Sequence, residues 1–221
     1  MKKRLIIAID GPAGSGKSST AKKLAGLLGY NYIDTGAMYR AFCLFLLKNN
    51  LLDEISHGIS LFLERDLKLI FEKGNIRVFL DGEDISDLIR TPEVSGLTSR
   101  ISTVGEVREV MVEMQRKLGA SGGVVLDGRD IGTVVFPSAD FKFYMTASPE
   151  ERVRRRILEL QEKGMEFDPE ETRRSVIERD IRDSSRDIAP MKKADDAIEI
   201  DTTGLTLDEQ VNKMYDIIAG N

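Results

Sequence analysis

Residues 11–18 of the chain read GPAGSGKS, which matches the pattern G-x-x-x-x-G-K-[ST]. An apolar run from Leu5 to Ile9 precedes this stretch, and a helical pattern from Lys17 to Leu28 follows it and is closed by Gly29. A strand, a glycine-rich loop and a helix in this order distinguish a phosphate-binding loop (P-loop) from a chance match, such as a glycine-rich turn with no ligand. We therefore predict that the chain binds a nucleoside triphosphate.

The chemistry of this loop follows from its residue types. Glycines let consecutive backbone N–H groups turn inward toward phosphate oxygens, and the helix N-terminus adds partial positive charge. Lys17 is expected to neutralise the β and γ phosphates, and the Ser18 hydroxyl to ligate Mg²⁺. The loop residues predicted to bind the nucleotide are Gly11, Pro12, Ala13, Gly14, Ser15, Gly16, Lys17, Ser18 and Ser19.

Short apolar runs elsewhere predict the rest of the fold. They lack clean alternation, as expected of strands covered on both faces. Helical patterns separate them, including one from about Ala37 to Lys48, and capping signals mark helix starts at 148–151, 168–171 and 206–209. This arrangement favours an α/β fold with a doubly wound, parallel five-stranded sheet. The strands after the first are predicted at 30–33, 124–126, 141–145 and 197–200.

The segment from Asp66 to Ile85 departs from this alternation of strands and helices. Apolar and polar residues alternate on both sides of Lys73-Gly74-Asn75, and Asp81-Gly82 marks a second turn. This pattern predicts an antiparallel hairpin inserted into the parallel fold. Such an insertion often covers a substrate, and a structural flap without a ligand is the alternative.

Composition narrows the class of protein. The chain has 221 residues, 41% hydrophobic and 31% charged, which is enough for one sizeable core. Its net charge of −5 argues against general nucleic-acid binding. The single cysteine, Cys43, excludes an internal disulfide and fits a cytoplasmic location, and the single histidine, His57, is expected on the surface, which argues against a Ser-His-Asp triad or a zinc site. The first apolar run is too short for a signal peptide or a membrane span.

Two carboxylates and a guanidinium follow the strand predicted at 124–126, where the sequence reads DGRD. Charges at an apolar strand end are costly unless they are paired. Asp127 has the position of a carboxylate that holds Mg²⁺ beside a P-loop, directly or through water. A helix cap or a partner for a nearby arginine is the alternative role.

Arginines near strand ends predict a second anion site. Arg40 and Arg129 follow strands at the edge of the sheet where ligands bind. Arg179, Asp183 and Arg186 are spaced by four and three residues, which places them on one helix face. Arginine suits this task because its planar fork holds phosphate oxygens bidentately. The sequence therefore favours a small-molecule kinase.

Other arginines and other P-loop classes fit this site less well. Arg152, Arg154 and Arg155 are interpreted as a solvated helix face with salt bridges to nearby glutamates. Arg152 and Arg156 are one helical turn apart. The chain lacks the guanine-reading N/T-K-x-D of a regulatory GTPase. The remaining rivals are another small-molecule P-loop kinase, such as a dephospho-coenzyme A, shikimate or adenylate kinase, and a nucleotide-regulated binding module without an acceptor.

Three stretches make the pattern specific: IDTGAMYRA at 33–41, LDGRDIGTVVFP at 126–137 and ERDIRDSSRDIAP at 178–190. Together with the P-loop and the hairpin, their order and spacing resemble the bacterial cytidylate kinases, which are nucleoside monophosphate kinases. The resemblance covers nearly the whole chain and implies transfer of a phosphoryl group from Mg-ATP to CMP or dCMP. It also implies a kinase core at 1–64 and 96–221 with a lid around 150–190, and a nucleotide-binding insert at 65–95.

The resemblance assigns roles position by position. Arg40 and Arg129 would grip the CMP phosphate, Arg179 and Asp183 would contact the sugar, and Arg186 would reach the phosphates. The catalytic residues would be Lys17, Arg129, Arg156 and Arg186. The cytosine would be read by Ser99, Arg108 and Asp130, with Thr35 near the substrate, Thr202 near the ATP adenine, and Ser18 and Asp127 at the metal.

One position departs from the family. Gly105 stands where the family commonly has a proline, shortly before Val107 and Arg108, which gives the backbone more freedom ahead of Arg108. The partners expected from the resemblance are ATP and CMP or dCMP, with no nucleic acid and no membrane, and the protein is expected to be a monomer.

Overall fold

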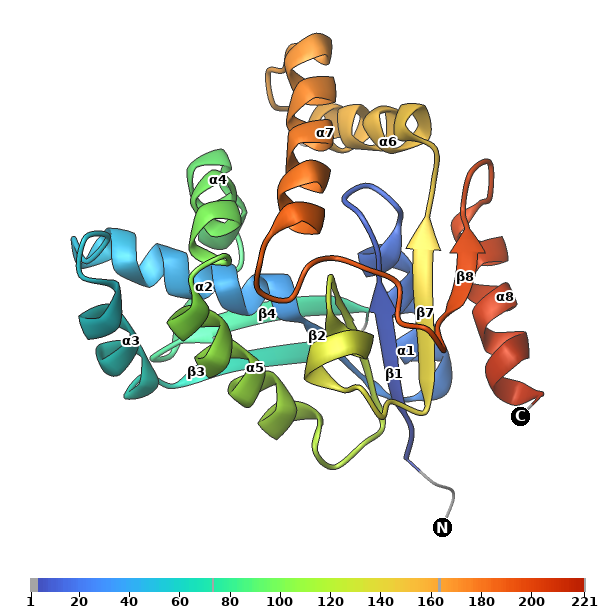
Figure 1. The fold of residues 1–221 in the computed structure, drawn as a ribbon, viewed down its shortest axis with the longest axis horizontal. Helices are drawn as coiled ribbons and strands as arrows, with labels where there is room; N and C mark the ends of the chain where they lie inside the picture. The colour runs from blue at the N-terminus through green and yellow to red at the C-terminus, as the bar shows by residue number, and fades with distance from the viewer. Residues whose placement is uncertain (1–3, 73, 163, 221) are drawn as a thin grey trace.

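Five parallel strands form the main sheet in a computed structural model that describes residues 4–72, 74–162 and 164–220 (Figure 1). The strand order is β2-β6-β1-β7-β8, and every neighbouring pair is parallel, which confirms the predicted fold class. Each predicted strand is present, with bounds shifted by at most a residue or two at either end. The strands are β1 (Ile6–Asp10), β2 (Asn31–Asp34), β6 (Val124–Gly128), β7 (Phe141–Thr146) and β8 (Ile198–Asp201).

Helices cover both faces of this sheet. On one face, α1 (Lys17–Leu28) and α8 (Leu207–Ala219) pack on Ile7 and Ile9 of β1. On the other face, α2 (Thr35–Lys48) and α5 (Gly105–Gly119) pack in the larger core, which contains Ala8. Alternate residues of β1 are therefore buried on opposite sides, as a doubly wound sheet requires.

The helix α2 begins two residues earlier than the sequence pattern predicts. The Asp34 carboxylate accepts a hydrogen bond from the Ala37 backbone N–H at 2.8 Å and so acts as the N-cap. This cap brings Thr35 and Gly36 into the first turn. The strand β2 therefore passes directly into α2, without a connecting loop.

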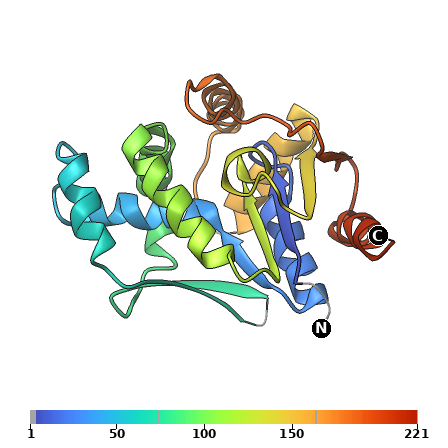
Figure 2. The same ribbon diagram turned by 60° about the horizontal axis from the view of Figure 1, so that its bottom comes forward.

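The predicted hairpin is present and belongs to a second, antiparallel sheet. Its strands are β3 (Leu67–Glu72), β4 (Asn75–Leu80) and the short β5 (Glu83–Asp84). Gly74 has φ 77° at the turn, and Lys73, which was also predicted there, lies outside the described residues. Figure 2 shows the hairpin running beside the helices toward the main sheet, where it contacts the edge strand β2. The hairpin thus shields an edge that a neighbouring chain would otherwise pair with.

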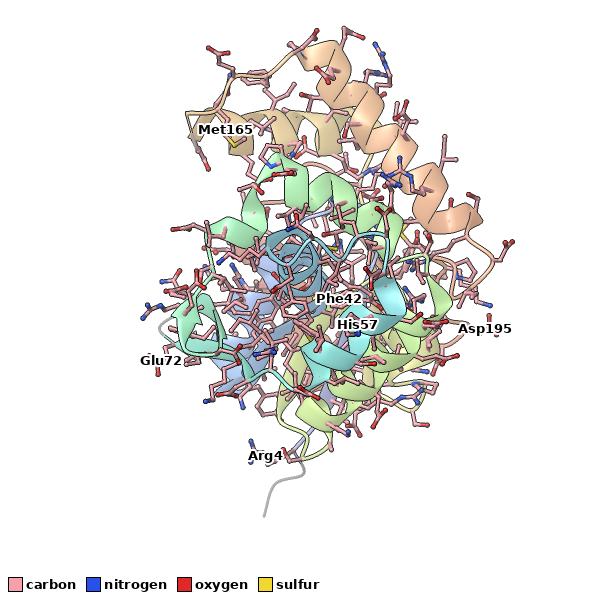
Figure 3. All side chains as sticks on the ribbon, turned by 90° about the vertical axis from the view of Figure 1, so that its left-hand side faces the viewer. Arg4, Phe42, His57, Glu72, Met165 and Asp195 are labelled. Atoms are coloured by element: carbon pink, nitrogen blue, oxygen red, sulfur yellow. The ribbon has the colours of Figure 1, made fainter. Side chains whose placement is uncertain are left out.

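Three further helical segments flank the hairpin in the sequence. They are α3 (Ile55–Leu63), the 3₁₀ turn η1 (Leu88–Arg90) and α4 (Pro92–Ile101). In Figure 3, His57 lies on α3 on the side facing the viewer, and it is exposed as predicted, although it sits in a helix and not in a turn. Phe42 of α2 is fully buried, with its ring centroid 5.1 Å from that of Phe62.

Two helices, α6 (Pro149–Glu162) and α7 (Pro169–Ser185), stand above the carboxyl ends of the strands (Figure 1). Both begin at a proline, and the Asp168 carboxylate caps α7 as the sequence predicts. The helix α7 ends at Ser185, because Arg186 has extended dihedrals, φ −68° and ψ 142°. Arg186 therefore leaves the helix that the residue spacing assigned to it. None of the helices in the described ranges has the length and apolar run that crossing a bilayer requires.

Candidate active site

The P-loop connects β1 to α1 with the backbone that its glycines predict. Gly11, Gly14 and Gly16 have φ 144°, 75° and 89°, in the region that side chains rarely adopt. A Cβ atom on Gly11 would lie 2.1 Å from the Met145 carbonyl oxygen, so glycine is also required by space. The helix α1 begins at Lys17, and its first N–H groups and dipole therefore face the loop.

Lys17 is buried beneath this loop, and its Nζ donates to the Pro12 carbonyl oxygen at 2.9 Å. Burial and, to a smaller extent, the positive charge of Arg129 together lower the pKa of Lys17 to about 7. Charging this amine therefore costs free energy until an anion arrives beside it.

The two predicted metal ligands lie side by side. The Ser18 hydroxyl donates to Asp127 Oδ2 at 2.6 Å, and the Tyr32 hydroxyl donates to Asp127 Oδ1 at 2.6 Å. Burial raises the pKa of Asp127, and the nearby Asp34 carboxylate raises it further. A nearby cation would relieve this cost by stabilising the charged form.

Arginines gather on the other side of the strand ends. Arg129 Nε donates to Asp183 Oδ2 at 2.8 Å, and Arg179 Nε lies 4.0 Å from the same oxygen. Arg40 Nη2 donates to Asp34 Oδ2 at 2.9 Å. Residues from α2, the end of β6 and α7 thus converge, as predicted.

A second group of side chains adjoins these arginines. Arg108 and Arg186 flank Asp130, Arg108 as a buried hydrogen-bonded ion pair and Arg186 with Nη2 3.8 Å from Asp130 Oδ1. The Arg108 guanidinium lies 5.9 Å from the centre of the Tyr39 ring, and burial raises the pKa of Tyr39 to about 12. Arg182 Nη1 donates to the Ser99 hydroxyl at 2.6 Å. Arg108 Nη1 also donates to the Ser102 carbonyl oxygen at 3.2 Å, and the Ser102 hydroxyl donates to the Ser99 carbonyl oxygen at 3.4 Å. These contacts link the three predicted base readers, and Arg182 is an unpredicted neighbour of Ser99.

Several nitrogens in this region are buried yet lack a hydrogen-bond partner. Buried donors in proteins are normally paired, because an unpaired donor loses its hydration without compensation. Among the described residues, the guanidinium nitrogens that are buried without a hydrogen-bond partner are Arg40 Nε, Arg108 Nε, Arg179 Nε and Arg186 Nη2. All four belong to arginines for which the sequence predicted a substrate contact.

The interpretation of Arg152 and Arg155 as solvated surface residues is wrong. Arg152 is 7% exposed, pairs with Asp180 of α7 and donates to the Ala13 carbonyl oxygen of the P-loop at 3.2 Å. Arg155 donates to the Thr202 hydroxyl at 3.0 Å. Arg155 does pair with Glu151, as predicted, but its side chain is only 19% exposed. Arg154 fits the prediction in full, with an exposed side chain paired to the same glutamate. The i,i+3 spacing of Arg152 and Arg155 was the available signal, but it does not say which helix face meets the loop.

Thr202 and Arg156, which were also predicted at the site, occupy different settings. The Thr202 hydroxyl is fully buried and lies within hydrogen-bond distance of the Ser15 and Thr146 carbonyl oxygens, at 2.9 and 2.8 Å, so it connects the P-loop to β7 through its one proton, which the two oxygens share. Arg156 is 41% exposed and pairs with Glu159 on its own helix. The contacts of both residues with ATP stay predictions.

One more residue of this region, Asp10, was missed by sequence reasoning. Asp10, at the end of β1, accepts hydrogen bonds from the Ile131 and Gly132 backbone N–H groups, each at 2.8 Å. Burial raises the pKa of Asp10 to about 6. Asp10 thereby fixes the turn that carries Arg129 and Asp130. Thr35 also holds this turn, since its hydroxyl donates to the Asp127 carbonyl oxygen at 2.7 Å.

A P-loop beside a buried carboxylate, with a cluster of partly buried arginines near the same strand ends, defines a P-loop phosphotransferase. A family model described as "Cytidylate kinase" matches residues 7–220. The cytidylate kinase of Carboxydothermus hydrogenoformans is 51% identical over 213 residues, 96% of each chain. That of Geobacter sulfurreducens is 48% identical over 219 residues, 98% of this chain and 94% of the relative. The chain belongs to the cytidylate kinase family.

The fold has a counterpart among solved structures. An uncharacterized protein from Eubacterium ventriosum superposes with a TM-score of 0.55 at 15% identity, covering 99% of this chain and 100% of the other. At this identity the likeness concerns the fold alone.

Proposed function

We propose that the protein transfers the γ-phosphoryl group of Mg-ATP to CMP or dCMP, giving ADP and the nucleoside diphosphate. The observation that carries this proposal is the set of four buried guanidinium nitrogens without hydrogen-bond partners in the described residues. One of these arginines, Arg179, lies within electrostatic reach of Lys17 of the P-loop. Such donors need an anion, and a nucleoside monophosphate brings one together with a sugar and a base. The relatives named as cytidylate kinases support the choice of base.

In this proposal, the P-loop and Lys17 hold the triphosphate of ATP. Arg40 and Arg129 grip the acceptor phosphate, and Arg186 bridges toward the transferring group. Burial, together with the charges of Arg129, Arg40 and Arg156, lowers the pKa of Arg179 to about 10. The repulsion among these positive charges favours binding of a multiply charged anion. Because Arg156 contributes to the repulsion, it lies within electrostatic reach of Arg179.

The metal would be held by Ser18 and Asp127. A hydroxyl and a carboxylate are hard oxygen ligands, and magnesium in such sites takes few protein ligands and completes its shell with phosphate and water. Their 2.6 Å separation fits this donor set. When bound, Mg²⁺ supplies positive charge beside the phosphates.

The acceptor nucleoside would be recognised by two groups of residues. Ser99, Arg108 and Asp130 would read the cytosine edge, because a carboxylate accepts from its amino group and a guanidinium donates to its carbonyl. Arg179 and Asp183 would contact the sugar. We keep 65–95 as the insert and 150–190 as the lid, and we propose that the enzyme is a cytoplasmic monomer, consistent with its use of ATP.

No covalent intermediate is required. The task of the protein is to bring two phosphates into line and to neutralise their charge. Exclusion of water by α6 and α7 prevents waste of ATP by hydrolysis. Arg152 and Arg155 already join α6 to the P-loop.

The test is ADP release from Mg-ATP with CMP, dCMP, UMP, AMP or shikimate as acceptor. Turnover with CMP and dCMP well above the rest is expected. Turnover with UMP or AMP instead would retain a kinase but discard the base readers, and shikimate turnover would place the protein with another kinase class. Tight ATP binding without acceptor-dependent ADP release would point to a binding module.

A further inference from the structure

We propose that Tyr32 is a positioning residue for the metal carboxylate Asp127, and that the inserted hairpin holds Tyr32 in place. Tyr32 lies on β2, at the edge of the main sheet, and no phosphate or base contact is assigned to it. Its hydroxyl donates to Asp127 Oδ1 at 2.6 Å. The proposal rests on Asp127 acting at the metal, which belongs to the proposed function.

Strand register explains how this contact arises. Tyr32 pairs with Val125 of β6, and Asp34 pairs with Asp127. Residues two apart in a strand share a face, so Asp127 lies one step above Val125 on the side where Tyr32 is buried. The same side is covered by α1, which begins with Lys17 and Ser18. A tyrosine at this register is long enough to reach the carboxylate from below.

Two hydroxyl groups therefore hold the two oxygens of Asp127. Ser18 donates to Oδ2 and Tyr32 to Oδ1, each at 2.6 Å. Donors on both oxygens fix the rotation of the carboxylate about its Cβ–Cγ bond. With the Tyr32 donor removed, the carboxylate keeps one tether and is free to turn, and such partners of a ligating side chain tune metal affinity.

The ring of Tyr32 is held from the hairpin side. Tyr32 is 2% exposed, and the Phe71 ring of β3 meets it edge-on, with centroids 5.7 Å apart and planes at 71°. Lys22 Nζ lies 5.9 Å from the centre of the same ring. A chain of contacts thus runs from the hairpin through Tyr32 and Asp127 to Ser18, linking the insert to the nucleotide side.

The experiment compares Tyr32→Phe with a matched control, Tyr30→Phe. The Tyr30 hydroxyl accepts from the Leu5 backbone N–H at 3.3 Å, on the same side of the molecule but away from the carboxylate. The readout is the factor by which Mn²⁺ strengthens ATP binding, taken as the ratio of the ATP Kd in EDTA to the Kd with Mn²⁺. Binding is measured by calorimetry without acceptor, so turnover plays no part.

For Tyr32→Phe we expect this ratio to fall about 10-fold. Removing a hydrogen-bond partner of a metal-ligating side chain typically weakens metal binding by about 10- to 100-fold, and we expect the lower end of that range. The Kd for ATP in EDTA and the KM for CMP are expected to stay near their wild-type values. Tyr30→Phe is expected to keep the full ratio. An unchanged ratio in Tyr32→Phe overturns the proposal, as does an equal fall in both variants.

A second variant keeps the proposal testable if Tyr32→Phe is unstable. Phe71→Leu leaves the Tyr32 hydroxyl in place but removes its edge-on support. We expect a smaller fall in the same ratio, about 2- to 5-fold, with unchanged ATP binding in EDTA. A wild-type ratio in Phe71→Leu overturns the link from the hairpin. A failure of the proposed function itself would be distinguishable, because CMP would then not be phosphorylated by the wild-type protein.

Discussion

The nucleotide side and the acceptor side of the site differ in how their polar groups are satisfied. On the nucleotide side, Lys17 is bonded to a P-loop carbonyl, and Ser18 and Tyr32 hold Asp127. On the acceptor side, the guanidinium groups of Arg40 and Arg179 each bury an Nε with no hydrogen-bond partner. The nucleotide side is thus preformed, whereas the acceptor side stores unpaired donors that an incoming anion satisfies.

The largest effect is expected from Lys17→Ala on the preformed side. Lys17 is the buried cation directly beneath the loop, so its removal takes away charge stabilisation during phosphoryl transfer. We expect kcat to fall by at least ~10²–10³-fold with the fold intact by circular dichroism. Lys23→Ala is the control, because Lys23 is exposed and pairs with Asp208. Normal turnover in Lys17→Ala would remove the P-loop from the mechanism.

Asp183→Ala tests the acceptor side. Asp183 is buried and accepts from Arg129 Nε, and although burial opposes its ionisation, the charges of Arg129 and Arg179 hold its pKa below the usual range. Its loss misplaces both arginines, so we expect the KM for CMP to rise roughly 10- to 100-fold, since a charge-assisted hydrogen bond contributes about 1.5–3 kcal/mol. The exposed Asp187→Ala is the control. A rise in the KM for ATP alone would break the division between the two sides.

Arg152→Ala asks whether the lid helix α6 is part of the preformed side. Arg152 joins Asp180 of α7 to the Ala13 carbonyl oxygen, with its side chain 8% exposed. Removing it leaves a partly buried carboxylate unpaired, so we expect a loss of about 2–3 kcal/mol in the free energy of unfolding. In a chain of this size that lowers Tm by roughly 5–10 °C. Arg154→Ala, on the exposed face of the same helix, should melt like the wild type, and equal melting of both variants would contradict the anchoring role.

Lys17, on the preformed nucleotide side, is expected to gain a proton when ATP binds. Because burial and Arg129 lower the pKa of Lys17 to about 7, the amine is mostly neutral at pH 8 in the free protein. The triphosphate restores its charge, so ATP binding at pH 8 should take up close to one proton. The proton count comes from binding enthalpies in buffers of different ionisation enthalpy. Lys17→Ala should abolish the uptake, and a wild-type binding enthalpy that does not depend on the buffer would show that Lys17 is already charged.

The lowered pKa of Lys17 also determines how the free energy of unfolding changes with pH. The folded-state pKa of Lys17 lies below its ordinary value of 10.5, so the unfolded chain binds more protons between about pH 7 and 10.5. The contribution of Lys17 to the stability of the free protein therefore rises with pH through this window. ATP should flatten that dependence.

Local signals in the sequence predict much of this molecule. The P-loop, the strands and the hairpin each occupy one continuous segment with its own periodicity or glycine pattern, so no distant contact is needed to recognise them. The clustering of Arg40, Arg129 and Asp183 also followed, because parallel strand ends meet at one edge. The first three features are encoded in short continuous segments, and the arginine cluster follows from the general geometry of a parallel sheet.

Other features depend on register and rotation between elements. Arg152 is buried and Arg155 is partly buried because α6 turns this face toward the P-loop, and helical spacing alone does not fix that rotation. Tyr32 reaches Asp127 only because β2 and β6 pair with Tyr32 opposite Val125. Arg186 leaves α7 near a loop in which the Met191 backbone N–H bonds to the Asp183 carbonyl oxygen. Such contacts join residues far apart in sequence, where composition and period carry no signal.

The smallest effect is expected from Gly105→Pro, which restores the residue common in the family on the acceptor side. Gly105 is the first residue of α5, where a proline loses no intrahelical hydrogen bond, and Val104 before it is extended at φ −74° and ψ 123°, as a residue before proline prefers. We expect the free energy of unfolding to rise by about 0.4–1 kcal/mol, through loss of freedom in the unfolded chain. Gly105→Ala adds a Cβ without fixing φ and is the control, because the added atom in either variant meets Ile188 Cδ1 at 3.2 Å. If proline lowers the KM for CMP relative to that for UMP and alanine does not, backbone freedom ahead of Arg108 weakens the binding of CMP on the acceptor side. If both variants are less stable than the wild type, the side chain of Ile188 cannot move away from the added Cβ atom.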